Sequence, residues 1–137
     1  MIKAYCRYLD LSELTEIMDV SVYQEFVSPI NYDFGLTRDT KHLVIGIVER
    51  KGTLWLYSTA EDSSKELNCI PAVLFAIERA KIPVGMTVSL INTERSSLEI
   101  LPESLACIEG WFERYVDEDE EIVKIVESEF ARFLLQG

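Results

Sequence analysis

The chain has 137 residues, 48% of them hydrophobic, and its 24 acidic and 13 basic side chains give a formal net charge of −11. This length suits a single globular domain over residues 1–137, and the apolar fraction excludes intrinsic disorder. No apolar stretch approaches the roughly 20 residues of a membrane-spanning helix. The negative charge argues against binding to nucleic acid or to an anionic membrane, because both require clustered Lys and Arg.

The amino-terminal segment predicts a short strand followed by helix. Residues 3–9 have a strand-like pattern, and Asp10 resembles an N-cap with Glu13 three positions further on. Four apolar residues then recur at helical spacing: Leu11, Leu14, Ile17 and Met18. We expect a helix to about Met18, a second short helix after it, and a polar loop over residues 31–40.

The clearest pattern in the sequence is a β-hairpin. Residues 42–49 and 53–59 are rich in β-branched and aromatic side chains, and Gly52 between them can adopt the positive φ of a short bulged turn. Apolar side chains alternate toward both faces of the second strand, with Leu54 and Leu56 on one face and Trp55 and Tyr57 on the other. Both faces are then covered, which places this pair at the centre of a sheet.

The middle of the chain predicts one more helix and a second hairpin. Asn68 can cap a helix that has Pro71 in its first turn and Pro83 at its far limit. Residues 86–91 and 97–101 then form two strands joined by a polar turn.

The carboxy-terminal third predicts two helices. Pro102 introduces the first, whose apolar residues recur at helical spacing as far as Tyr115. Asp117 caps the second, with Glu120 at its third position. The apolar face of this last helix is broad and consists of Ile122, Ile125, Val126, Phe130, Phe133 and Leu134.

The resulting order of elements is β-α-β-β-α-β-β-α-α. Adjacent hairpins favour a mainly antiparallel sheet, here of about four or five strands, with helices packed on it. The sequence therefore predicts an α+β fold whose carboxy-terminal helix is long and acidic at its start.

No catalytic or metal-binding signature occurs in the sequence. His42, the only histidine, begins an apolar strand and is interpreted as a surface residue at the strand edge. Cys6, Cys69 and Cys107 have apolar neighbours and are interpreted as small buried side chains. Cys69 is the one candidate nucleophile, because a predicted helix start there lowers the pKa of a thiol. Zinc-ligand spacings and glycine-rich phosphate loops are absent from the sequence, so we predict no enzyme, no metal and no cofactor.

Acidic residues concentrate in the second half of the chain. Residues 69–137 hold 13 acidic and 6 basic side chains, and five acids are consecutive: Asp117, Glu118, Asp119, Glu120 and Glu121. An acidic side chain in the first turn of a helix contributes about 0.3 to 1 kcal/mol, but the effect fades within that turn. Five adjacent carboxylates are more than the stabilisation of the first helical turn requires. Either solubility or a docking surface for Lys and Arg explains the excess.

The leading hypothesis is a bacterial, cytoplasmic binding protein that neutralises or regulates a basic partner, as an immunity protein or antitoxin does for a toxin nuclease. Its candidate partner-binding residues are the five consecutive acids, Trp111 as an aromatic anchor, and Glu61 with Asp62, which either flank a cleft or solvate a loop. One alternative is a small enzyme or ligand-binding domain with a pocket near His42 or Cys69. Another is a homo-oligomeric structural subunit whose apolar sheet face pairs with itself.

Overall fold

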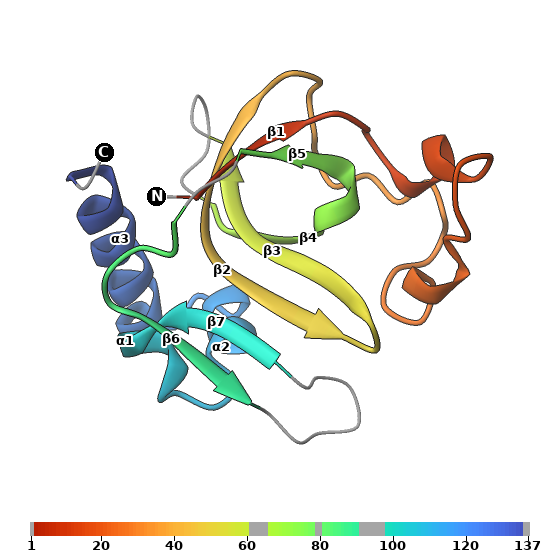
Figure 1. The fold of residues 1–137 in the computed structure, drawn as a ribbon. Helices are drawn as coiled ribbons and strands as arrows, with labels where there is room; N and C mark the ends of the chain where they lie inside the picture. The colour runs from red at the N-terminus through yellow and green to blue at the C-terminus, as the bar shows by residue number, and fades with distance from the viewer. Residues whose placement is uncertain (1, 61–65, 79–80, 91–97, 136–137) are drawn as a thin grey trace.

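The computed structural model describes residues 2–60, 66–78, 81–90 and 98–135 (Figure 1). Its strands are β1 Ile2–Cys6, β2 Lys41–Arg50, β3 Thr53–Ala60, β4 Asn68–Pro71, β5 Phe75–Ile77, β6 Met86–Leu90 and β7 Leu98–Pro102. Its α-helices are α1 Glu103–Ala106, α2 Trp111–Val116 and α3 Glu120–Leu135. Three short 3₁₀ turns complete the described part: η1 Leu11–Leu14, η2 Ser21–Tyr23 and η3 Ala72–Leu74.

The described strands form one curled, antiparallel sheet, which confirms the predicted α+β class. Five of them lie in the order β4-β3-β2-β1-β5, and β7 pairs with β2 on one side and with β6 on the other. In Figure 1, β2 and β3 run through the middle of the sheet, α3 lies to one side, and the amino-terminal turns lie at the opposite side. Among the described residues, no helix is both long and apolar enough to cross a membrane.

The central hairpin β2–β3 matches its prediction. Arg50 pairs with Thr53, so the turn consists of Lys51 and Gly52 alone, and both have positive φ, at 47° and 84°. Two residues with positive φ make a type I′ turn, whose twist matches that of the flanking strands. Residues on both faces of β3 are buried, as expected for a strand at the sheet centre.

Strand β2 contains a bulge and pairs with two strands along the same edge. Its first half pairs with β1, its later residues pair with β7, and the register shifts between Val44 and Gly46. A Cβ atom at Gly46 would lie 2.6 Å from Cδ2 of Leu101, so a larger residue would force this side chain to move where β7 approaches β2.

The amino-terminal helix prediction is only partly correct. Asp10 does act as a cap, because its carboxylate accepts a hydrogen bond from the backbone N–H of Ser12 at 2.9 Å, but only the turns η1 and η2 follow it. Asp19 accepts from the backbone N–H of Ser21 in the same way, at 2.9 Å. Such short polar side chains compete with helical hydrogen bonding and break the segment into separate turns. The loop over residues 31–40 is confirmed.

The helix predicted after Asn68 is wrong. Residues 68–77 form β4, η3 and β5 instead, and β4 pairs with β3 so that Ile70 lies opposite Leu56 in the core. Pro71 occupies the last position of β4, at the edge of the sheet, where a missing N–H is tolerated. With these two strands the described residues hold seven, against the four or five predicted.

The first predicted carboxy-terminal helix begins after Pro102 as expected but is divided into α1 and α2, and the last helix starts later than predicted. Gly110 adopts a left-handed conformation with φ 68° and separates α1 from α2. Asp117 ends α2, while Asp119 caps α3 by accepting a hydrogen bond from the backbone N–H of Glu121 at 3.1 Å. Three of the six predicted apolar-face residues of α3 are fully buried (Ile122, Val126 and Phe133), whereas Leu134 is exposed.

Candidate partner-binding groove

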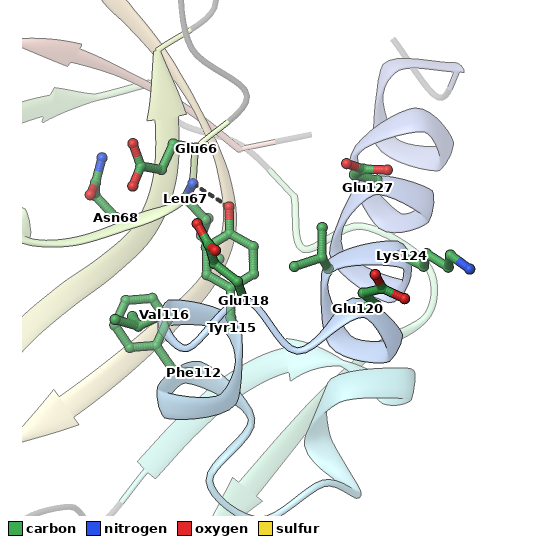
Figure 2. Close-up of a pocket in the computed structure, with 11 residues that line it drawn as sticks. Glu66, Leu67, Asn68, Phe112, Tyr115, Val116, Glu118, Glu120, Lys124 and Glu127 are labelled. Atoms are coloured by element: carbon green, nitrogen blue, oxygen red, sulfur yellow. Dashed lines mark hydrogen bonds between the residues drawn. The ribbon is translucent and has the colours of Figure 1, made fainter.

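A groove opens between α2, α3 and the start of β4 (Figure 2). Its volume is about 890 Å³. The lining residues are Glu66, Leu67, Asn68, Phe112, Tyr115, Val116, Glu118, Glu120, Val123, Lys124 and Glu127. Helix periodicity brings Glu120, Val123 and Glu127 to the same side of α3, because residues three, four and seven apart share a face.

The floor of the groove is apolar and held in place by specific contacts. The hydroxyl of Tyr115 accepts a hydrogen bond from the backbone N–H of Leu67 at 2.9 Å, which ties α2 to the approach of β4. The rings of Phe112 and Tyr115 lie nearly parallel, with an interplanar angle of 18° and centroids 6.3 Å apart. Beside them, Val116 has 61% of its surface exposed. The floor therefore offers ordered apolar surface to another molecule.

The rim of the groove is acidic. Glu66, Glu118, Glu120 and Glu127 come from three different segments, and all four are exposed. Lys124 is the one basic residue among the described lining residues. Figure 2 shows its ammonium group pointing away from Phe112 and Tyr115. The four carboxylates therefore give the groove a net negative charge, which the single lysine does not neutralise.

Four of the five consecutive acids fall into two sets, and the fifth, Asp117, ends α2 outside the groove lining. Arg114 donates from Nε and Nη2 to Oδ2 of Asp119, at 2.9 and 2.8 Å, and its Nη2 lies 3.6 Å from Oε2 of Glu121. These hydrogen bonds from Arg114 lower the pKa of Asp119. Glu118, with φ 60° in the turn between the helices, and Glu120 line the groove instead. The predicted acidic run is therefore partly neutralised and partly directed into the groove.

Trp111 does not have the exposed position expected of an aromatic anchor. Only 4% of its surface is accessible, and its ring packs against Tyr57 and Phe112 at centroid distances of 4.8 and 5.6 Å. The indole packs behind Phe112, on the side away from the groove. Phe112 and Tyr115, rather than Trp111, are the aromatic side chains that line the groove. Trp111 is the first residue of α2, and its place in the sequence alone does not show whether its side chain faces the core or the solvent.

Glu61 and Asp62, the other predicted contact residues, lie outside the described residues. Glu66, a few positions further along the chain, lies on the groove rim together with Glu127 of α3. Sequence reasoning missed both. Glu127 could have been found from its seven-residue spacing from Glu120, which places the two on one helix face. Glu66 carries no comparable signal.

The two predicted reactive side chains occupy different surroundings from those expected. His42 is buried rather than exposed, its ring 5.0 Å from that of Phe75 and its Nδ1 3.5 Å from Oγ of Ser58. Cys69 lies in a strand, and burial raises the pKa of its thiol to about 11, the opposite of an activated nucleophile. Cys6 is buried as predicted, whereas Cys107 is exposed.

A smaller hollow of about 380 Å³ is lined by Cys69 and Arg50, among other residues. The guanidinium of Arg50 lies over the rings of Trp55 and Phe26, 5.4 and 5.9 Å from their centroids. This cation holds the amino-terminal segment against the sheet.

In the described parts of the chain, no three His, Cys, Asp or Glu side chains are arranged to hold a metal ion. No family model matches the chain, no curated protein is significantly similar to it, and no solved structure matches its fold. The function of this protein has to be inferred from its own groove and surfaces.

Proposed function

We propose that this protein binds a basic segment of a partner protein in the groove between α2 and α3, and so neutralises or regulates that partner. The observation that carries the proposal is the combination of four glutamates on the rim with an apolar, partly aromatic floor. Either feature alone is common on protein surfaces, whereas the two together match the long basic side chains of Lys and Arg.

Lys and Arg side chains combine an aliphatic stem with a charged end. The stem can pack on Val116 and on the rings of Phe112 and Tyr115, while the charged end reaches the carboxylates of the rim. A guanidinium over an aromatic ring contributes about 0.5 to 1 kcal/mol at an exposed site and more where water is excluded. The groove thus favours Arg and Lys over other residues.

The charge of the whole molecule supports the same partner. A formal net charge of −11 attracts a basic protein over several ångströms and raises the rate of encounter, an effect that salt screens. The specific contacts in the groove then determine which part of the partner is bound. Binding should therefore weaken as ionic strength rises.

A cytoplasmic inhibitor of a basic toxin, such as a nuclease, is the specific role that we favour. A protein that binds nucleic acid presents clustered Lys and Arg to the phosphates, and an acidic protein can cover that surface. The three cysteines are free in the structure, which suits a reducing compartment. This role makes the groove an analogue of the nucleic acid that the partner would otherwise bind.

The experiment measures binding of a fluorescent, arginine-rich peptide by anisotropy, with a glutamine-substituted peptide of equal length as the reference. We expect the wild-type protein to bind the basic peptide only. The double variant Glu118→Lys, Glu120→Lys should weaken binding at least about tenfold, because 1.4 kcal/mol corresponds to a factor of ten and like charges cost more than that.

The matched control is Asp117→Lys with Glu16→Lys, which changes the net charge equally at two exposed acids outside the groove lining. It should weaken binding only slightly, through the general field. Equal loss in the two double variants would show that the groove has no specific role.

A further inference from the structure

The side of α3 that lines the groove continues toward the end of the helix. Successive side chains of an α-helix are turned by about 100°, because one turn takes about 3.6 residues. Four α3 residues line the groove, and on this geometry they share an arc of about 100°: Glu120, Val123, Lys124 and Glu127. Leu134 follows Glu127 by seven residues, falls in the same arc, and has 55% of its surface exposed. This side of α3 thus presents two glutamates near its start and an exposed leucine near its end.

Three positions on this side of α3 recur at one spacing. Glu120, Glu127 and Leu134 are seven residues apart, which corresponds to about 10.5 Å along the helix axis for each step. Ala131 falls on the same side and is exposed. Its small side chain leaves room for another chain, because the distance between packed helices depends on the side chains at the contact. We call these four residues the α3 row; it is about 21 Å long.

The spacing of the two glutamates distinguishes a helical partner from an extended one. Side chains on one face of a β-strand are two residues apart, so they are separated by about 6.6 Å or about 13 Å. Neither separation matches the step of about 10.5 Å from Glu120 to Glu127. A second helix has the same rise per residue as α3, and its residues seven apart share a face. A helix lying beside α3 therefore matches the α3 row at every step.

The α2 side of the groove completes a site for a helix. Phe112, Tyr115 and Val116 lie across the groove from α3 (Figure 2), and Val116 is 61% exposed. A groove with an apolar floor between two helices is a common site for an amphipathic helix, which places its apolar side on the floor. The same helix can direct its basic side chains to the glutamates of the rim.

We propose that the basic segment bound in the groove is an amphipathic helix that lies antiparallel to α3. One of its apolar residues packs on Leu134, and basic residues seven and fourteen positions later pair with Glu127 and Glu120. The inference rests on the proposed function and adds the conformation, the spacing and the direction of the bound segment.

The charge pattern of the α3 row determines the direction. The glutamates are near the start of α3, so an antiparallel partner presents its basic residues toward its own carboxy-terminal end. Cations there interact favourably with the dipole of the partner helix, whereas a parallel partner would carry them near its amino-terminal end, where they are unfavourable. The antiparallel arrangement therefore satisfies both the glutamates and the partner helix.

Three fluorescent peptides of 18 residues, built on alanine and glutamine, test the proposal by anisotropy. The matched peptide has leucine at position 2 and arginine at positions 9 and 16. The mismatched peptide has the same composition but arginine at positions 9 and 14, about 140° apart around a helix. The third is the matched peptide with proline at position 12, which breaks a helix. We expect the matched peptide to bind at least about tenfold more tightly than the others and to gain helical circular dichroism on mixing.

Equal affinities for the matched and mismatched peptides overturn the helical partner and leave the proposed function intact. Equally tight binding of the proline peptide, without a gain in helical signal, does the same and is the result expected for an extended segment. Binding of the arginine-rich peptide described above without binding of the matched peptide also overturns this inference alone. Failure of the arginine-rich peptide and all three designed peptides to bind overturns the proposed function together with it.

A charge exchange tests the direction of the partner. In the antiparallel arrangement, position 9 of the peptide lies opposite Glu127 and position 16 lies opposite Glu120. The variant Glu127→Arg should therefore bind a peptide with glutamate at position 9 at least about tenfold more tightly than one with glutamate at position 16. The reverse preference, or equal affinity for the two peptides, overturns the antiparallel arrangement.

The contact at Leu134 has a matched control in the next residue. Leu135 is 90% exposed and is turned by about 100° from Leu134, away from the α3 row. Leu134→Ala should weaken binding of the matched peptide at least about threefold, because apolar surface is no longer buried there. Leu135→Ala should leave the affinity unchanged. Equal effects of the two substitutions overturn the packing of the partner on Leu134.

Discussion

The two hairpins β2–β3 and β6–β7 have similarly apolar sequences but very different surroundings. β3 has a neighbouring strand on each side and protein on both faces, so the side chains from Trp55 to Thr59 are all buried. β6 has one neighbour in the described structure and leaves Val88 and Leu90 exposed.

This difference shows that burial of a strand is determined by what the rest of the chain places around it. The central hairpin contributes its apolar side chains to stability, because they leave water on folding. The outer hairpin contributes one face to the fold, and on its other face Val88 and Leu90 remain exposed. Four predictions test this division.

The largest effect is expected for Leu56→Ala compared with Leu54→Ala. The two leucines are on the same face of β3, but Leu56 is 1% exposed and Leu54 is 49% exposed. Truncation of Leu56 should cost about 2 to 5 kcal/mol, and truncation of Leu54 less than about 1 kcal/mol. Urea denaturation at low protein concentration measures both. Similar losses at the two positions would contradict the distinction between the hairpins.

A smaller effect is expected in the turn of the central hairpin. Gly52 has φ 84°, which costs a residue with a Cβ atom about 1 to 2 kcal/mol, so Gly52→Ala should lower stability by that amount. Lys51 has φ 47°, and Lys51→Asn should raise stability slightly, because Asn-Gly is the preferred type I′ turn. Thermal denaturation reports both signs, and a stabilising Gly52→Ala would contradict the turn type.

Glu99 of β7 makes the outer hairpin sensitive to pH. Burial raises the pKa of this carboxyl group, although the Arg50 charge partly opposes the shift. The folded state therefore holds the proton more tightly than the unfolded state. The contribution of Glu99 to stability is fully present below the ordinary glutamate pKa, about 4.3, and is lost as the pH rises through the higher folded value. Glu99→Gln should be more stable than wild type at pH 7 and equal to it near pH 3, as measured by urea denaturation. A difference independent of pH would contradict this origin.

The smallest effect concerns the reactivity of two cysteines, Cys69 and Cys107, and involves no change in the stability of the protein. Cys69 is adjacent to Tyr57 of the central hairpin, and burial raises the pKa of its thiol to about 11, whereas Cys107 follows α1 and is exposed. At pH 8 a thiol reagent should modify one cysteine rapidly in the native protein and all three after denaturation. Rapid modification of two in the native state would indicate that the sheet opens beside Cys69.

The hairpins themselves could be predicted from the sequence, because their information is local. Alternating apolar residues and the glycine at position 52 define β2–β3 without reference to the rest of the chain. The segment after Asn68 could not, because its pattern fits a helix and a strand equally well. Pairing of Ile70 opposite Leu56 decided between them, and that contact joins distant parts of the chain.

The candidate site could be predicted only in part, because some of its residues are marked by the local sequence and others are brought in by contacts between segments. Glu118 and Glu120 stand out as members of an acidic run, and both line the groove. The ion pair that neutralises Asp119 depends on the turn between α2 and α3, which brings Arg114 to it. Glu66 joins the rim only because β4 lies beside α2, a contact fixed by the hydrogen bond from Leu67 to Tyr115.

The packing of Trp111 behind Phe112 gives this protein an internal optical reporter. Its indole is one ring removed from the groove, while Trp55, the other tryptophan, lies beneath Arg50 at the amino-terminal turns. Occupancy of the groove should therefore change the emission of Trp111 and leave that of Trp55 as a constant reference. Single replacements of each tryptophan by phenylalanine would separate the two signals, so that binding can be followed without any label.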